Sequence, residues 1–498
     1  MDNKELASGV NIINGETKIS LSSFVSRNPA DWSEVIGYFP QSSQSDIDAA
    51  VSAAKNVYKT WRLVPAPKRA EILYRTAQIL TERKEELAIL MTREMGKNLT
   101  ESRGDVQEAI DMCKFIAGEG RRLHGETTTS ELPNKTAFST RISIGVAALI
   151  TPWNFPIAIP SWKVAPALIC GNTVVLKPSE DTPACAEAFV RILLEAGLDK
   201  YPGVINLVHG NGKVGAALVA HPDTRLVSFT GSSEVGSLIA AQCASLKKRT
   251  PIREMGGKNC TIVMDDANLN LAIASSWWGA YGTCGQRCTA SSRMIVHEKV
   301  LNKFLAGLMK RTLDTMIGNG LDPKIEVGPL INFPALRKVE MYMDIARQEG
   351  AEILCGGKRL RGGDYDKGLF FELTILLAPD PKMRVNQEEI FGPVTSIIPV
   401  RSFEEALEVA NDVNYGLSTA IITNDVNKAF IAMRDLESRI TYINSSTIGA
   451  EVHLPFGGTK MTGDGHSEGG HAIDSYSDLK TCYIDYSGSL QKAQIDNN

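Results

Sequence analysis

Four short apolar runs decide the fold, and they read "VAALITPWNFP" (146–156), "NTVVLKPSE" (172–180), "GVINLVHG" (203–210) and "TRLVSFTGS" (224–232). Each is rich in valine, leucine or isoleucine and ends at a proline or glycine turn. Helix-length patterns separate most of them. Buried strands that alternate with helices form a parallel sheet with helices on both faces. The sequence therefore predicts an α/β fold.

The alternation returns further along the chain. After "REMGGKNCTIVMDD" (253–266) a second α/β pattern runs to about residue 450. The first third looks mostly helical: apolar stripes predict helices over 45–61, 67–97 and about 100–119, the second of them one long helix. Two segments alternate like strands, "TAFSTRISI" (136–144) and "KTCYIDYSG" (480–488). They could pair with each other or with a second subunit, because an exposed strand edge is normally covered.

Composition excludes several classes of protein. The 498 residues, 43% of them apolar, suffice for two or three domains. A net charge of −4 offers no basic surface for nucleic acid or a membrane, and no stretch is long and apolar enough to span a bilayer. Nine cysteines, an odd number without a C-x-x-C pair, argue against a disulfide framework. We expect a cytoplasmic protein that binds neither nucleic acid nor a membrane.

Three turns carry possible cofactor signals. A literal dinucleotide fingerprint, "GNGKVG", places glycines at 210, 212 and 215, and a second glycine-rich turn runs from Gly231 to Gly236 in "FTGSSEVG". Backbone amides of a first helical turn there could hold pyrophosphate. The third is "LKPSE", in which Lys177 and Glu180 end a strand and could hold ribose hydroxyls. Taken singly, each is as well explained by a tight turn or a surface ion pair.

The segment "YGTCGQRCTASSR" (281–293) holds two thiols, Cys284 and Cys288. The nearest histidine is His297, so we expect no metal site. A lone cysteine is more often a core residue than a nucleophile. In "GQRC", however, Arg287 and an expected helix N-terminus would both favour a thiolate at Cys288.

Three further segments supply partners for this thiol. "TPWNFP" holds Asn154 between prolines, as suits an oxyanion donor. "REMGGK" leaves the Glu254 carboxylate uncrowded beside two glycines, as suits a general base. "NQEEIFGP" carries Glu388 and Glu389 before a Gly–Pro turn, a second place for a carboxylate to meet a ligand.

With these residues the chain resembles the aldehyde dehydrogenase superfamily. Seven of its motifs appear in the family's order: "PWNFP", "GNTVVLKPSE", "FTGSSEVG", "EMGGKN", "GQRCT", "EEIFGP" and "PFGGTKMTG". The spacing from Glu254 to Cys288, 288 − 254 = 34, is similar too. The resemblance implies a Rossmann-type NAD(P)-binding domain over 1–125 and 145–255, an α/β catalytic domain over 256–455, and a small β oligomerisation arm with the C-terminal segment over 126–144 and 456–498. It also implies a homodimer or homotetramer.

The resemblance implies a role for each matching residue. Cys288 attacks the aldehyde carbon, Asn154 and the Cys288 N–H hold the oxyanion, and Glu254 activates water to release the acid. The implied cofactor-binding residues are Trp153, Lys177, Ser179, Glu180, Gly215, Phe229, Gly231, Ser232, Gly236, Gly256, Glu389 and Phe391. The family places pyrophosphate at Gly231–Gly236, so the literal fingerprint at Gly210 is a near match only. Cys284 has no family role and is interpreted as packing.

One departure concerns a family glutamate proposed as an auxiliary proton acceptor. In "TGDGHSEGG", Ser467 stands at its position and Glu468 is next to it, so we assign no such role. The cofactor expectation is NAD, because a carboxylate at Glu180 repels a 2′-phosphate. NADP remains an alternative, since Lys177 could pair with that phosphate.

The expected substrate is a short carboxylate-bearing semialdehyde such as 2-oxoglutarate semialdehyde. Arg287, Ser445 and Phe456 are the expected binding residues, because a guanidinium binds carboxylate bidentately and "SSTIGAEVHLPFGG" (445–458) resembles the loop of semialdehyde dehydrogenases. Alternatively, Arg287 turns away and pairs with a local acid. Other aldehydes remain open: aminoadipate or succinate semialdehyde, glyceraldehyde 3-phosphate, or a broad aliphatic range. So do a coenzyme A-dependent variant, against which Glu254 argues, and a non-catalytic dinucleotide-binding protein.

Overall fold

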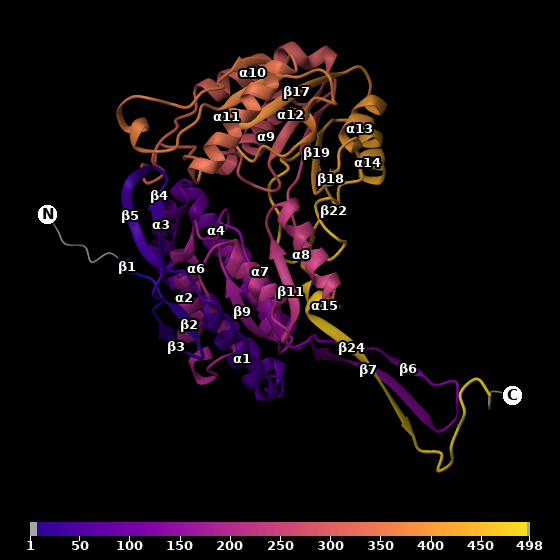
Figure 1. Ribbon diagram of the computed structural model, residues 1–498. Helices are drawn as coiled ribbons and strands as arrows, with labels where there is room; N and C mark the ends of the chain where they lie inside the picture. Colours follow the sequence, from indigo (N-terminus) through magenta and orange to yellow (C-terminus); the bar gives the residue numbers. More distant parts are fainter. Residues whose placement is uncertain (1–6, 496–498) are drawn as a thin grey trace.

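The computed structural model describes residues 7–495, which form two α/β lobes and a projecting arm (Figure 1). The first lobe is built on a seven-stranded sheet of order β12-β11-β8-β9-β10-β2-β3. Its strands are β2 (Asn11–Ile13), β3 (Glu16–Lys18), β8 (Val146–Ile150), β9 (Thr173–Lys177), β10 (Ile205–Leu207), β11 (Thr224–Thr230) and β12 (Ile252–Glu254). The strands from β8 to β12 are parallel, so the predicted Rossmann-type α/β arrangement is confirmed.

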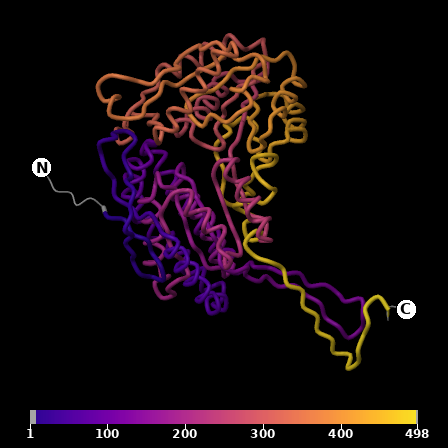
Figure 2. Tube along the Cα trace, in the orientation of Figure 1, coloured from indigo at the N-terminus to yellow at the C-terminus, as the bar shows by residue number. Residues whose placement is uncertain are grey.

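Helices cover this sheet, and the chain's first third lies beside the later helices of the same lobe (Figure 2). They are α1 (Gln44–Trp61), α2 (Ala66–Glu82), α3 (Lys84–Met95), α4 (Leu99–Glu119), α5 (Ala158–Ile169), α6 (Pro183–Glu195), the short η1 (Leu198–Lys200), α7 (Gly212–Ala220) and α8 (Ser233–Ser245). The single long helix predicted over 67–97 is wrong. It breaks at Arg83, which leaves helical geometry with φ −102° and ψ 15°. The break lets α2 and α3 both pack against α4.

The second lobe repeats the pattern with a seven-stranded sheet of order β15-β16-β17-β14-β13-β19-β20. Its strands are β13 (Asn259–Val263), β14 (Ser291–His297), β15 (Glu352–Cys355), β16 (Thr374–Leu377), β17 (Val394–Val400), β19 (Ser418–Ile422) and β20 (Ile440–Ile443). Its helices are α9 (Leu269–Tyr281), η2 (Gly282–Gly285), α10 (Glu298–Leu313), α11 (Phe333–Gln348), η3 (Gly363–Lys367), α12 (Arg384–Gln387), α13 (Phe403–Asn411) and α14 (Val426–Asp435).

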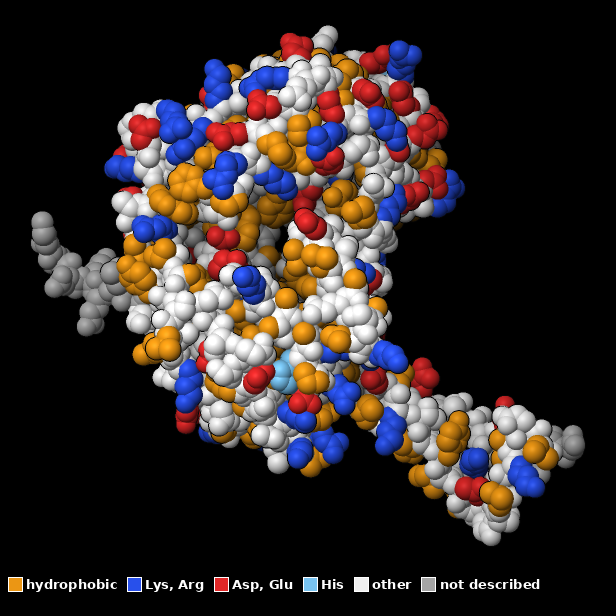
Figure 3. Space-filling model, in the orientation of Figure 1, with side chains coloured by type: hydrophobic (Ala, Val, Ile, Leu, Met, Phe, Trp, Pro, Cys, Tyr) orange, Lys and Arg blue, Asp and Glu red, His pale blue; other side chains and the backbone are white. Residues whose placement is uncertain are grey.

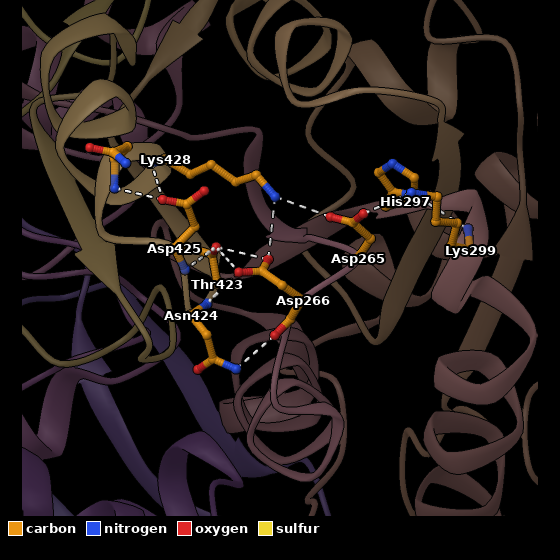
Figure 4. Close-up of polar contacts among 9 residues, drawn as sticks. Asp265, Asp266, His297, Lys299, Thr423, Asn424, Asp425 and Lys428 are labelled. Carbon is orange, nitrogen blue, oxygen red and sulfur yellow. Dashed lines mark hydrogen bonds and ion pairs between the residues drawn. The ribbon is translucent and has the colours of Figure 1, made fainter.

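A charged network closes the carboxyl edge of this second sheet (Figure 4). Lys428 of α14 reaches Asp265 at 3.1 Å and Asp266 at 3.5 Å, both just beyond β13. Thr423, just beyond β19, donates to Asp266 over 2.9 Å. Carboxyl edges of open α/β sheets commonly bind ligands. Here Lys428 pairs with the carboxylates at this edge, so they tie α14 to the sheet.

The arm is a three-stranded sheet of order β24-β7-β6, with β6 (Thr127–Thr129), β7 (Lys135–Ser143) and β24 (Ser477–Asp485). β7 and β24 pair antiparallel from Ser477 opposite Ser143 to Asp485 opposite Lys135. The two alternating segments therefore pair with each other. The outer edge of β24 stays open, and it carries the exposed side chains of Leu479, Tyr483 and Ile484.

The remaining elements are short, and several of them connect the lobes. β1 (Ala7–Ser8), β4 (Ser23–Asn28) and β5 (Asp31–Pro40) form an N-terminal sheet. The segment before the arm holds β21 (Pro455–Phe456), β22 (Thr459–Lys460), β23 (Glu468–Gly469) and α15 (Ala472–Tyr476), and β22 pairs with β18 (Tyr415–Gly416). Within residues 7–495, no helix has the length and apolarity needed to cross a membrane.

The candidate catalytic residues lie where the two sheets face each other. In the first lobe they follow the carboxyl ends of strands: Asn154 comes after β8, Gly231 after β11, and Glu254 ends β12. In the second lobe they precede amino ends, with Cys288 before β14 and Glu389 before β17. The surface is hollowed between the two lobes (Figure 3).

Candidate active site

Two cavities meet at Cys288. The first, here called the Arg287 cavity, is lined by Glu108, Phe155, Ile159, Trp162, Thr230, Glu254, Met255, Arg287, Cys288, Thr289, Leu417, Ile448, Gly449, Ala450, Phe456 and Glu468. The second, the Phe391 cavity, is lined by Pro152, Trp153, Asn154, Ile159, Thr230, Gly231, Ser232, Met255, Gly256, Cys288, Ile331, Asn332, Pro334, Ala335, Lys338, Glu389, Ile390 and Phe391. Cys288, Thr230, Met255 and Ile159 line both. A molecule in either cavity therefore has access to the thiol.

Cys288 sits in an irregular turn between α9 and β14. The predicted helix N-terminus is wrong: the chain passes through left-handed Thr283 (φ 55°) and Cys284 (φ 57°) and then a turn, with no helix beginning at Cys288. Asn259 holds this turn by donating its amide to the Cys288 carbonyl over 2.6 Å. The geometry presents the thiol to the cavities rather than to the core.

The free thiol is protonated at neutral pH. Burial raises the pKa of Cys288 to about 12, and the carboxylates of Glu389 and Glu254 add to this effect. Arg287 and the Thr289 N–H act in the opposite direction. A group that removes negative charge near the thiol would make it more nucleophilic.

Cys284 contributes packing and no chemistry to this arrangement. Its side chain is fully enclosed in the core of the second lobe, and burial raises its pKa far above the ordinary value. The two thiols of this segment therefore differ in their surroundings: Cys284 lies in the core, and Cys288 reaches both cavities.

Asn154 is buried in the loop between β8 and α5. Its Nδ2 donates to the Gln286 carbonyl over 3.1 Å, and none of the described hydrogen bonds uses its Oδ1. One N–H of the amide is thereby hydrogen-bonded within the protein, and the second is able to donate to an oxygen atom in the cavity. Fixed amide donors of this kind stabilise developing oxyanions.

Glu254 ends β12 with a buried carboxylate, neither oxygen of which has a hydrogen-bond partner within residues 7–495. Burial raises its pKa well above the ordinary value, Glu468 raises it further, and Lys163 opposes the rise. Gly231 donates to its carbonyl over 3.1 Å, and Met255 donates to Thr462 over 2.8 Å. The strand end is therefore clamped while the carboxyl faces the cavity.

Glu468 is a cavity residue that the sequence did not assign. It lies 4% exposed, pairs with the buried Lys163 of α5, and faces the same cavity as Glu254. Ser467, the position expected for an auxiliary acid, instead accepts from Arg439 over 2.8 Å. The acid that faces the cavity therefore stands one position after Ser467, directly next to the expected residue.

Six of the twelve expected cofactor residues line the Phe391 cavity: Trp153, Gly231, Ser232, Gly256, Glu389 and Phe391. The Trp153 and Phe391 rings meet edge to face at 5.5 Å. Glu389 accepts from the Gly257 N–H over 2.9 Å. A Cβ on Gly256 would stand 2.3 Å from the Glu389 carboxylate, so only glycine leaves that position open. Burial raises the pKa of Glu389, and Lys338, a cavity residue that the sequence did not indicate, opposes that rise.

The other six lie outside that lining: Lys177, Ser179, Glu180, Gly215, Phe229 and Gly236. Lys177 ends β9 with its ammonium 3.6 Å from Glu180, whose side chain is half-exposed. Gly215 of α7 brings its backbone to the Lys177 stem, since a Cβ there would lie 3.5 Å from the lysine Cδ. At Gly210, the literal fingerprint forms a turn that precedes the Asn211 cap of α7.

Of the three expected substrate residues, Arg287 and Phe456 line the Arg287 cavity and Ser445 does not. Ser445 is exposed, and its loop contributes Ile448, Gly449 and Ala450 instead. Arg287 combines the two alternatives left open by the sequence. It pairs with Glu101 at 2.9 Å and still faces the cavity.

Glu101, Asp105 and Glu108 gave a signal that was overlooked. They recur four and three residues apart on α4, so they share one helix face, and that face is turned inward. Glu101 and Asp105 are buried, and Glu108 lines the Arg287 cavity. Acids on the inner stripe of a helix indicate a polar site. Within residues 7–495, no cluster of three histidine, cysteine or acidic side chains is placed to hold a metal ion.

Comparison with known proteins agrees with this geometry. The family described as "Aldehyde dehydrogenase family" matches residues 17–482. An alpha-ketoglutaric semialdehyde dehydrogenase of Bacillus subtilis is 40% identical over 95% of this chain and 98% of its own length. An alpha-ketoglutarate semialdehyde dehydrogenase of Haloferax volcanii is 42% identical over 96% of this chain and 99% of its own.

A solved structure extends the likeness to three dimensions. Betaine aldehyde dehydrogenase of Staphylococcus aureus, in complex with NAD+, superposes with a TM-score of 0.94 at 34% identity, covering 98% of this chain and 96% of its own. With a family match over most of its length, this chain belongs to the aldehyde dehydrogenase family and is an oxidoreductase that acts on aldehydes.

Proposed function

We propose that the protein oxidises 2-oxoglutarate semialdehyde, or a similar short acidic semialdehyde, to the carboxylic acid with NAD. One observation carries the proposal: Cys288 opens onto both cavities, one with Arg287 on its wall and the other with Glu389 and Phe391. Two relatives named for this semialdehyde support the choice of substrate.

The Phe391 cavity suits a nicotinamide dinucleotide. Its aromatic wall, the open space kept by Gly256 and the N-terminal end of α8 at Ser232 match a flat ring, a ribose and a pyrophosphate. Thr230 adds a hydroxyl without a partner in the described part of the chain. NAD+, when bound, supplies the acceptor for the hydride that leaves the aldehyde carbon.

The chain's own residues act in sequence. The Cys288 sulfur bonds to the aldehyde carbon and gives a thiohemiacetal, whose oxygen Asn154 and the Cys288 N–H hold. Loss of hydride from that carbon leaves a thioester on the sulfur. Glu254 takes a proton from water, the resulting hydroxide attacks the thioester, and the acid leaves with the thiol restored. Water and the aldehyde thus give acid while NAD+ becomes NADH and a proton.

The acidic head group would contact Arg287. Nε of Arg287 donates to Thr283 over 2.8 Å and Nη2 to Glu101 over 2.9 Å, while no described hydrogen bond uses Nη1. A fixed guanidinium with one free edge binds a carboxylate at little cost in side-chain entropy. For the cofactor, the half-exposed Glu180 beside Lys177 favours ribose hydroxyls over a 2′-phosphate, so we propose NAD over NADP.

Steady-state kinetics test these assignments. The panel is 2-oxoglutarate, succinate and aminoadipate semialdehydes, glyceraldehyde 3-phosphate and hexanal, each with NAD or NADP, with and without coenzyme A. We expect acid and NADH without coenzyme A, and the highest kcat/KM for 2-oxoglutarate semialdehyde with NAD. A strict need for coenzyme A, or a preference for hexanal or NADP, would contradict the corresponding part.

We also propose a homodimer or homotetramer that covers the open edge of β24. Exposed apolar side chains on that edge support this. Deleting residues from 482 onward removes the outer half of β24, so we expect a monomeric or aggregating protein by light scattering. A truncated protein with the mass of the full-length assembly would refute the proposal.

A further inference from the structure

The inner stripe of α4 contains one acid without a counterion. Glu101 pairs with Arg287, and Asp105 pairs with the fully buried Lys97 at 2.9 Å. Asp105 also accepts from the Ala158 N–H over 2.8 Å. Glu108, one turn further along, is half-buried on the cavity wall; it forms no ion pair with any residue from 7 to 495, and the Trp162 side chain is its hydrogen-bonding neighbour. An acid that faces a cavity without a counterion is available to a ligand.

Arg287 is held rigidly beside it. Besides Thr283 and Glu101, its guanidinium lies 5.0 Å from the Phe155 ring and 5.2 Å from the Trp278 ring. Four contacts fix the plane, and Glu101 already neutralises one side. The guanidinium therefore cannot swing away to form an ion pair with Glu108, and the structure contains none.

Trp162 of α5 lines the Arg287 cavity together with Glu108 and Arg287. Its indole N–H is buried, and the acceptor it faces is the Glu108 carboxyl group. It and Arg287 are both near enough to Glu108 to favour the ionised carboxylate. A guanidinium group, an indole N–H and a carboxyl group without a counterion thus share one cavity with the thiol of Cys288.

We propose that Glu108 selects the head group of the substrate through its own ionisation: as a neutral acid it admits an α-keto acid beside Arg287, and as a carboxylate it favours an α-amino acid. This deepens the proposed function, on which it rests for Arg287 as the carboxylate anchor. A neutral Glu108 donates its O–H to the keto group, whereas an ionised one repels the keto acid and pairs with an ammonium group.

The surroundings keep both ionisation states within reach near neutrality. Burial and, after it, the negative charge of Asp105 raise the pKa of Glu108 to about 7 against the opposing effects of Arg287, Lys97 and the Trp162 hydrogen bond. The charged groups on the elements around it are Glu101 and Asp105 on α4, Lys97 just before it, Arg287 on the loop before β14, and the cavity acids Glu254 and Glu468. On α5, the indole N–H of Trp162 faces Glu108, and the buried Lys163 pairs with Glu468.

The test compares wild type with Glu108→Gln on three aldehydes from pH 6 to 8.5. These are 2-oxoglutarate semialdehyde, 2-aminoadipate semialdehyde and hexanal. For wild type, kcat/KM for the keto acid divided by that for hexanal should fall roughly tenfold for each pH unit above the pKa of Glu108. In Glu108→Gln this ratio should be flat, because the amide cannot ionise. Because the ionisation of Cys288 and Glu254 affects kcat/KM for both aldehydes alike, its effect cancels in the ratio to hexanal.

The amino substrate gives the opposite sign. At pH 8 the Glu108→Gln variant should lose roughly tenfold in kcat/KM for 2-aminoadipate semialdehyde relative to wild type, since a charged partner is removed. Cyclisation of this substrate is the same for both enzymes and cancels in the ratio. The exposed Glu86→Gln on α3 is the matched control and should leave all three substrates unchanged.

Two results would overturn the proposal: a pH slope for the keto acid that persists in Glu108→Gln, or an unchanged response to the amino substrate. Retained hexanal turnover shows that the variant is folded. Arg287→Met separates this proposal from the one on which it rests. If that variant leaves both acidic substrates unaffected relative to hexanal, the carboxylate anchor is wrong, whatever Glu108 does.

Discussion

The side-chain amide of Asn154 donates a hydrogen bond to the Gln286 carbonyl over 3.1 Å, across 132 residues of sequence. This bond joins the loop after β8 to the turn that carries the thiol. It fixes the amide plane with one N–H directed to protein and the other free. An oxyanion on a carbon bonded to Cys288 would find that second N–H already oriented.

Replacing this donor should slow turnover without loosening the fold. We expect Asn154→Ala to lower kcat by roughly 10² to 10³, the usual cost of one oxyanion donor. Steady-state assays measure it, with Asn427→Ala on the exposed surface of α14 as the control. A loss below about threefold would show that another group holds the oxyanion.

Removing the nucleophile should abolish dehydrogenase turnover. We expect Cys288→Ala to retain its fold and cofactor affinity, as followed by circular dichroism and fluorescence titration with NADH. The buried Cys284→Ala variant should remain active, because its thiol reaches neither cavity. Substantial residual kcat in Cys288→Ala would refute the covalent route.

The reactivity of the thiol should depend on pH in a defined direction. With its pKa raised to about 12, Cys288 of the free enzyme should react with iodoacetamide ever faster from pH 7 to 10 without a plateau. Glu254→Gln removes a negative neighbour, which lowers the thiol pKa and speeds alkylation at pH 8. A plateau near pH 7 would mean that the free thiol is already activated.

Glu254 should serve the second half of the reaction. In Glu254→Gln, deacylation slows because no carboxylate accepts the proton of water. Stopped-flow absorbance at the NADH band should show a burst near one equivalent per site followed by slow turnover. Loss of the burst would instead place Glu254 in activation of the thiol.

The buried ion pair of Lys163 with Glu468 should be costly to break. Lys163→Met leaves an uncompensated carboxylate inside the protein, so the free energy of unfolding should fall by about 3–5 kcal/mol. Lys68→Met removes an exposed pair with Glu71 and should cost at most about 1 kcal/mol. Chemical denaturation measures the free energy of unfolding of both variants. Equal decreases would show that burial of the ion pair does not matter.

The sheets could be predicted because their signal is local. Strand β9 is five consecutive buried residues, and its amphipathic neighbour α1 shows the expected stripe ending at Trp61. The motif residues Asn154, Glu254 and Cys288 also follow or precede strand ends directly, so a parallel-sheet reading already brings them to one region.

What escaped prediction depends on contacts between distant segments. The break at Arg83 lets α2 and α3 both pack against α4, which is a tertiary contact. The helix-forming pattern of the sequence continues across Arg83, so it does not indicate the break. Arg287 meets an acid 186 residues earlier, so no local pattern reveals that it both pairs and faces a cavity. Glu468 faces the cavity because it pairs with Lys163, 305 residues earlier, and no local pattern distinguishes it from its neighbour Ser467.

The clamp on Glu254 also has a consequence for biosynthesis. Met255 hydrogen-bonds to Thr462, Glu254 forms a bridge with Gly463, and Lys163 meets Glu468, so the last tenth of the chain completes the cavity. A ribosome makes the nucleophile and the strand bearing the base long before it makes these partners. The nascent polypeptide therefore carries its thiol without a finished pocket, and catalytic competence requires that residues 462–468 have been added and folded back.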